Sequence, residues 1–123
     1  EVDCLHSPNF TSMYQQTTST ILMVRPANFG FNPETAENNF YQQRDGRDSI
    51  EINRLAQEEF DGFVRLLREY GVRVLVIDDT SEPKKTDAIF PNNWFSTHED
   101  GKIILYPMFS PNRRLERRKD IIE

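Results

Sequence analysis

A stretch between residues 86 and 116 holds the side chains best suited to binding a small polar ligand. Phe90-Pro91-Asn92-Asn93 places two amides side by side after an aromatic residue, and Asp87 precedes them. Amides donate and accept hydrogen bonds, and a carboxylate accepts them, so this group has the chemistry to recognise a polar molecule. Pro-Asn-Asn is equally an ordinary turn sequence, and these residue types alone leave both interpretations open.

Two consecutive arginines, Arg113 and Arg114, stand where the sequence predicts the start of a helix. Cations there oppose the helix dipole, which favours anions at the N-terminal end. Together with the helix N-terminus they would form an anion site, and a guanidinium fork suits a carboxylate well. The alternative is a pair of solvated arginines that tolerate a small electrostatic penalty.

No set of residues for nucleophilic catalysis is complete. Such a site needs a nucleophile within reach of a base that a third group orients. Cys4 and His6 lie in a polar, aperiodic segment where nothing would hold them, and His98 lies in a predicted exposed turn with Glu99 and Asp100. One cysteine and two histidines are too few and too scattered for a protein-only zinc site. We therefore predict no catalytic residue and no metal site in this chain.

Composition excludes several classes of protein. The 123 residues suffice for one small domain, and 37% hydrophobic residues is a modest share for an independent core. A net charge of -5 argues against nucleic-acid binding, and we interpret the basic run from residue 113 to 119 as a solvated helix face. The single cysteine suits a reducing compartment, and no signal peptide or membrane span is visible. We expect a cytoplasmic protein with no nucleic-acid or membrane partner.

The candidate residues must be positioned by a few predicted elements. Residues 1–19 are predicted to be a flexible tail, with Met13 as a candidate native start. Thr20–Arg25 reads as a buried strand and Pro26–Gly46 as a long loop, a feature that is often functional.

The clearest element is a helix capped by Asp48 or Ser49, with Gly71 at the position of a C-terminal glycine cap. Its apolar residues recur with the helical period, and we interpret this stripe as core packing. The stripe comprises Ile52, Leu55, Ala56, Phe60, Phe63, Val64 and Leu67.

The remaining pattern predicts strands, a hairpin and a last helix. The predicted strands are Val72–Ile77, Asp87–Phe90, and the pair Asn93–Thr97 and Lys102–Tyr106 around an Asp-Gly turn. A helix is predicted from Asn112 to the chain end, with Ser110 as its cap and Pro111 in its first turn. This order of strand, loop, helix, strand, hairpin and helix indicates an α/β fold.

The spacing of these motifs resembles the first half of dimethylarginine dimethylaminohydrolases. Those enzymes show an Asp-x-x-Phe-x-Glu-Asp pattern, then a proline and Arg-Arg-x-Glu. Here Asp87, Phe90 and Asn92-Asn93 are followed by Pro107 and by Arg113-Arg114 with Glu116. The stretches ILMVRPANFGFNPETAENN and FPNNWFSTHEDGKIILYPMFSPNRRLERR are most similar to the citrulline utilization hydrolases, a branch of the amidinotransferase and arginine deiminase superfamily. The resemblance covers Met13 to the end.

The resemblance implies a partial pentein, a five-bladed αβ propeller, of which residues 20–123 would form about the first two blades. It implies cysteine nucleophilic catalysis with a histidine handling protons, both expected in a missing C-terminal half of the same domain. No metal or organic cofactor is implied. We therefore expect an inactive N-terminal fragment that ends within a helix. Its unpaired sheet edges favour self-association, so a homo-oligomer is one of the expected partners.

The resemblance also assigns binding roles by position. Asp87 matches an acidic residue that helps shape the substrate site, and Phe90 matches the aromatic of the same motif. Asn92 and Asn93 stand where the dimethylarginine enzymes have two acids. Arg113 matches an arginine that holds the substrate's α-carboxylate, and Arg114 matches it less directly. The predicted substrate-binding residues are therefore Asp87, Phe90, Asn92, Asn93, Arg113 and Arg114.

Two amides in place of two acids bear on the substrate. Carboxylates hold a cationic guanidinium best, whereas an amide matches a neutral ureido group, which has both a carbonyl and N–H groups. We expect hydrolysis of a C–N bond in a ureido or guanidino amino acid, with citrulline first. The alternatives are dimethylarginine dimethylaminohydrolase, arginine deiminase or amidinotransferase activity, or a non-catalytic binding module that keeps part of the scaffold.

Overall fold

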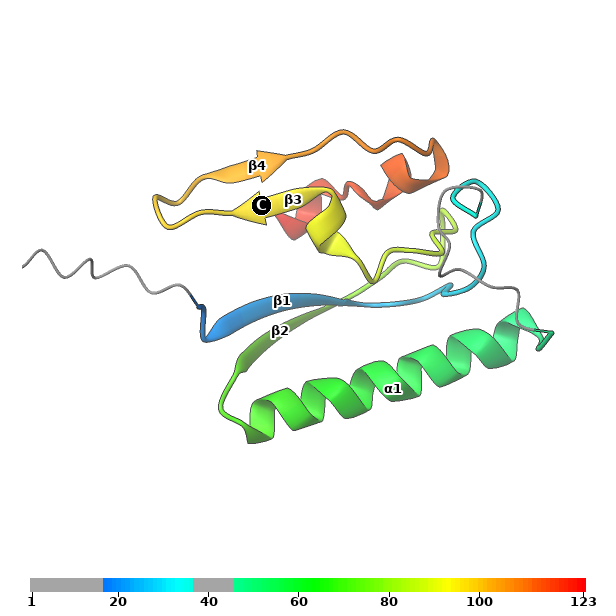
Figure 1. Ribbon diagram of the computed structural model, residues 1–123, viewed down its shortest axis with the longest axis horizontal. Coiled ribbons are helices and arrows are strands. Elements are labelled where there is room, and N and C mark those ends of the chain that lie inside the picture. The colour runs from blue at the N-terminus through cyan, green and yellow to red at the C-terminus, as the bar shows by residue number, and fades with distance from the viewer. Residues whose placement is uncertain (1–16, 37–45) are drawn as a thin grey trace, which may run out of the picture.

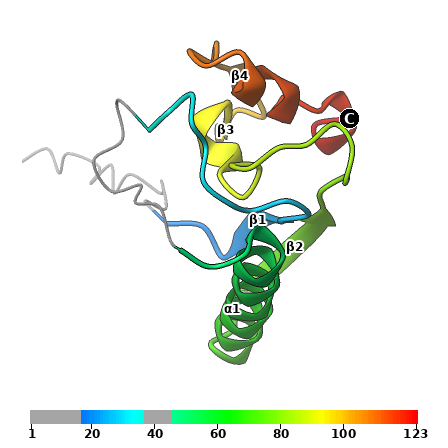
Figure 2. The same cartoon turned by 90° about the vertical axis from the view of Figure 1, so that its right-hand side faces the viewer.

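The computed structural model describes residues 17–36 and 46–123. Most of the predicted tail, with Cys4, His6 and Met13, lies outside the described residues, as does the second part of the long loop, residues 37–45. The described residues form layers in which helix α1 covers one face of the β1–β2 sheet. The β3–β4 hairpin and the C-terminal turns lie over the other face (Figures 1 and 2).

The central unit is a β-α-β crossover. Strands β1 (Thr20–Arg25) and β2 (Arg73–Asp78) are parallel neighbours in which Thr20 lies opposite Arg73 and Arg25 opposite Asp78. Helix α1 (Ser49–Glu69) returns the chain between them, as a parallel pair requires. Both strands were predicted, the second within one residue, because their β-branched and apolar residues suit a half-buried sheet.

The two ends of α1 differ in how they are capped. Asp48 is the N-cap residue, but its side chain makes no capping hydrogen bond. At the other end Gly71 has φ 83°, and its N–H donates to Arg68 O at 3.0 Å while Val72 N–H donates to Leu67 O at 3.0 Å. These two bonds form a Schellman motif, which requires the left-handed conformation that glycine adopts freely. The predicted glycine cap is confirmed, whereas the side-chain cap by Asp48 is absent.

The apolar core lies between α1 and the sheet. It is built on Phe60, Val64 and Val74, with Ile21 and Met23 of β1 packed against them. The predicted core stripe is correct for Phe60 and Val64, but Phe63 is 51% exposed. Phe63 lies at the edge of the helical stripe, and a sheet of two strands is too narrow to cover that edge.

The predicted hairpin is confirmed in a shorter form. Strands β3 (Phe95–Thr97) and β4 (Ile103–Leu105) are antiparallel, and Gly101 turns the chain with φ 80°. Asn93 was predicted to begin strand β3, but it lies in a 3-10 turn, η1 (Pro91–Asn93). Proline at the start of η1 has no N–H to offer a strand partner, which favours the turn.

Two predicted elements are wrong. Asp87–Phe90 is a turn, in which Phe90 N–H donates to Asp87 O at 3.0 Å; Ala88 and Ile89 face inward and Phe90 is exposed, instead of the segment forming a strand. The last helix is two separate 3-10 turns, η2 (Asn112–Glu116) and η3 (Lys119–Ile121), and the N-cap of η2 is Pro111. This charged segment has no apolar stripe of helical period, so burial cannot sustain a longer helix.

The predicted α/β class is confirmed, whereas the five-bladed propeller stays a prediction. No helix in the described part of the chain has the length and apolar character needed to cross a membrane. Many large apolar side chains lie at the surface, above all on α1, β2 and the hairpin. Those at least half exposed are Ile50, Phe63, Tyr70 and Phe109.

Candidate functional site

Asp87 is the buried centre of the predicted site. Its Oδ2 accepts a hydrogen bond from Asn32 Nδ2 at 2.6 Å and lies 3.7 Å from Arg113 Nε. The other oxygen, Oδ1, accepts no hydrogen bond from the described residues. The structure therefore brings Asp87 and Arg113, two of the predicted binding residues, together and leaves one carboxylate oxygen available.

Arg113 also holds a second carboxylate, which was not among the predicted binding residues. Its Nε and Nη2 each donate to Glu116 at 2.9 Å, and Glu116 is only 3% exposed. Burial raises the pKa of Glu116, and the opposing effect of Arg113 is smaller. The fork of Arg113 is thus already engaged, and only its Nη1 makes no hydrogen bond among the residues described.

Asn32 is the functional candidate that sequence reasoning missed. It lies in the loop after β1, is 1% exposed, and donates to Asp87. Its Oδ1 accepts from Asn112 Nδ2 at 2.6 Å and from Glu34 N at 3.1 Å. The length of the loop signalled function, but nothing in its aperiodic sequence indicates which residue turns inward.

The two arginines have different partners. Arg114 Nε donates to Met108 O at 3.0 Å and Nη2 to Phe109 O at 3.3 Å, so this side chain braces the segment before η2. The first N–H of η2, that of Asn112, donates to Glu34 Oε2 at 3.1 Å. The anion site predicted at this helix start is therefore already filled by a carboxylate of the chain itself.

The other three predicted residues face solvent. Phe90, Asn92 and Asn93 are exposed, while Pro91 and Trp94 beside them are buried and anchor η1. The two amide side chains make no hydrogen bond within residues 17–36 and 46–123. The six predicted residues thus divide into a buried carboxylate with its half-buried arginine, a bracing arginine and an exposed group that is open to a ligand.

A second buried charge cluster fixes the segment that leads from β2 to Asp87. Asp79 and Lys85 have side chains that are each 1% exposed, and Nζ lies 3.2 Å from Oδ1. Lys85 also donates to Thr80 Oγ1 and Pro83 O, both at 2.8 Å, and Arg118 Nη1 lies 3.5 Å from Asp79. Because both charges are buried, their pairing restrains this segment strongly.

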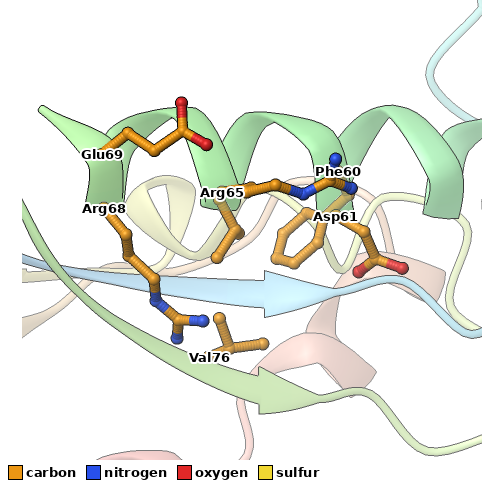
Figure 3. Close-up of a pocket in the computed structure, with 7 residues that line it drawn as sticks. Phe60, Asp61, Arg65, Arg68, Glu69 and Val76 are labelled. Atoms are coloured by element: carbon orange, nitrogen blue, oxygen red, sulfur yellow. The ribbon is translucent and has the colours of Figure 1, made fainter.

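One small cavity borders these regions, and a larger one lies apart from them. A cavity of about 240 Å³ opens beside Asn32 and Glu116, with Lys84, Thr86 and Asn112 also in its wall. A larger one of about 650 Å³ lies between α1 and β2, where Arg68 of the helix reaches toward Val76 of the strand and Arg65 runs along the helix (Figure 3). None of the six predicted residues lines the larger cavity, which follows the edge of β2 that pairs with no other described strand.

Of the other candidates for chemistry, only His98 lies among the described residues. His98 is exposed, as predicted, and its Nε2 lies 2.9 Å from Ser96 Oγ on the hairpin. No group of three or more His, Cys, Asp or Glu is placed to hold a metal ion in the part of the chain that the structure describes.

One protein family matches most of the chain, including this region. The model of a family described as N,N dimethylarginine dimethylhydrolase, eukaryotic, matches residues 25–123. This range includes the whole of α1, β2 and the hairpin, and all six predicted binding residues. No curated protein and no solved structure matches the chain.

Proposed function

Because the chain belongs to the eukaryotic N,N-dimethylarginine dimethylhydrolase family, we propose that it carries part of the substrate site of a hydrolase acting on a C–N bond of a ureido or guanidino amino acid. The family lies within the amidinotransferase superfamily. In the proposed intact enzyme a cysteine attacks the substrate carbon and a histidine handles protons. Both groups would come from parts of a propeller domain beyond the residues described here.

The observation that carries the proposal is the arrangement around Asp87. Asn32 and Arg113 hold one of its oxygens, and the other accepts no hydrogen bond from the described chain. Phe90, Asn92 and Asn93 follow directly and face solvent. A fixed carboxylate followed in the chain by exposed amides and an aromatic ring suits the recognition of a small polar molecule.

We propose citrulline as the substrate. Asp87 already faces the charge of Arg113, and Asn92 and Asn93 add none. A guanidinium would find less negative charge here than two acids at positions 92 and 93 would supply, whereas a ureido group can donate to one amide and accept from another. N,N-dimethylarginine is the second candidate, because the description of the matching family names it.

A substrate comparison in the full-length protein that contains this chain tests the proposal. We expect consumption of citrulline with a kcat/KM at least about tenfold above that for N,N-dimethylarginine, the ratio that one charge-assisted hydrogen bond provides. Asn93→Asp should shift this preference toward the guanidino compound by roughly tenfold. Thr97→Asp is the matched control, since it adds the same charge on the exposed hairpin.

Each outcome has a distinct meaning. If neither amino acid is consumed, the hydrolase proposal fails. If the protein is active but Asn93→Asp leaves selectivity as it was, the assignment to a ureido substrate fails and dimethylarginine takes its place.

A further inference from the structure

Asn32 connects three segments that are far apart in the sequence. Its amide lies in the loop after β1, donates to Asp87 in the turn before η1, and accepts from Asn112 at the start of η2. The residue after Asn112 is Arg113, the half-buried arginine of the predicted site. One buried side chain therefore forms hydrogen bonds with the carboxylate and with the residue that precedes the arginine.

Both the nitrogen and the oxygen of the Asn32 side-chain amide form hydrogen bonds. Nδ2 donates to Asp87 Oδ2 at 2.6 Å, while Oδ1 accepts from Asn112 Nδ2 at 2.6 Å and from Glu34 N at 3.1 Å. No other residue of this size offers a donor and an acceptor in the same plane without a charge. Aspartate would remove the donor and place a second carboxylate against Asp87.

The geometry of Asn112 shows how strongly this link is favoured. Asn112 directs its amide nitrogen to Asn32, and its own Oδ1 is buried without a hydrogen-bond partner among the described residues. A buried acceptor without a partner is costly, so the bond to Asn32 fixes the orientation of Asn112 and with it the start of η2. The carboxylate of Asp87 and the start of η2, which carries Arg113, are thus held by the same amide.

We propose that Asn32 is a positioning residue for substrate binding. It holds Asp87 Oδ2 toward Arg113, so that Oδ1 points to the ligand, and it fixes η2 relative to that oxygen. Asn32 acts through Asp87 and Asn112 and does not touch the substrate. This inference rests on the proposed function.

Asn53 provides a matched control in the same part of the chain. Its Nδ2 donates to Ala27 O at 3.0 Å and its Oδ1 accepts from Phe29 N at 2.8 Å, so it braces the same loop against α1. Neither hydrogen bond involves Asp87 or Asn112. Asn53→Asp and Asn32→Asp are equally isosteric and each removes one amide donor, but only the second disconnects Asp87.

The test measures KM and kcat of both variants in the full-length protein, with the substrate that the wild type consumes. For Asn32→Asp we expect KM to rise roughly tenfold to hundredfold while kcat changes less than about threefold, because the loss falls on binding. For Asn53→Asp we expect both constants to stay within about threefold of the wild type. Asn32→Ser adds no charge and keeps a hydroxyl donor, and its KM should lie between these values. It replaces Asn32→Asp if that variant does not fold.

The outcomes separate this inference from the function it rests on. An active wild type in which the Asn32 and Asn53 variants lose activity alike would show that Asn32 only braces the loop, and the positioning role would be rejected. A fall in kcat with unchanged KM would also reject it. A wild type that consumes neither amino acid would remove the proposed function, and this inference with it.

Discussion

The two buried regions of this molecule are held together in different ways. Between α1 and the β1–β2 sheet, Phe60, Val64 and Val74 pack by non-directional apolar contact. Around Asp87, buried polar side chains are held by directional hydrogen bonds to Asn32 and by the nearby charge of Arg113. The comparison teaches that apolar burial sets the stability of the β-α-β unit, whereas polar contacts set the geometry of the candidate site.

The largest effect is expected in the apolar core. Phe60→Ala should lower the free energy of unfolding by about 3–5 kcal/mol, because it removes a buried ring and leaves a cavity. Phe63→Ala, on the same helix but half exposed, should cost less than about 1 kcal/mol. Urea unfolding followed by circular dichroism measures both. Equal losses would contradict the packing described here.

The buried charges should be the next most sensitive feature. Lys85→Met leaves Asp79 with Arg118 as its remaining cation, and should cost about 3 kcal/mol in unfolding free energy. Lys84→Met, at an exposed neighbour, should change it by less than about 0.5 kcal/mol.

A double variant sharpens this test of the ion pair. Replacing both partners, Asp79→Leu with Lys85→Met, should recover much of the loss, because no unpaired buried carboxylate remains. If the double variant is no more stable than Lys85→Met alone, the charge pairing is not the cause of the loss.

The polar cluster also predicts a pH dependence. Burial raises the pKa of Glu116 in the folded state above its value of 4.5 in the unfolded chain, so the folded protein binds the proton more tightly. The contribution of Glu116 to stability is therefore most favourable below pH 4.5 and declines as pH rises through its folded pKa. The slope is at most about 1.4 kcal/mol per pH unit.

The Glu116→Gln variant should lack this pH-dependent contribution, because a glutamine side chain does not titrate. The measurement is the difference in unfolding free energy between wild type and variant from pH 4 to pH 7, and it should fall with rising pH. A difference that grows with pH would mean that Arg113 outweighs burial.

The smallest effect is expected at the surface between β1 and α1. Arg25 donates to both oxygens of Asp61 at 2.8 and 2.9 Å, but the pair is largely exposed. Asp61→Asn should cost about 0.5 kcal/mol in dilute buffer, and less in 1 M salt because ions screen the pair. A loss as large as that of Lys85→Met would remove the distinction between buried and exposed charges.

Patterns local in sequence predicted much of the fold. The strand before Pro26, the period of α1 and the glycine at position 71 each reflect interactions within one element, and the structure confirms them. Prediction failed where an element depended on what packs against it. Asp87–Phe90 had a strand-like composition but turns inward, and the charged C-terminal segment had helical residues but no apolar face to bury.

The sequence by itself determined the α/β class, the β-α-β unit, the hairpin and, through motif spacing, the family that the match over residues 25–123 supports. It also singled out Asp87 and Arg113, which the structure brings together. Only the tertiary structure revealed that Asn32 bonds both Asp87 and Asn112, the residue before Arg113, that Glu116 occupies the arginine fork, and that Asn92 and Asn93 face solvent. The physical reason is that periodicity and capping act between neighbours in the chain, whereas a buried hydrogen bond joins atoms whose separation in sequence leaves no local trace.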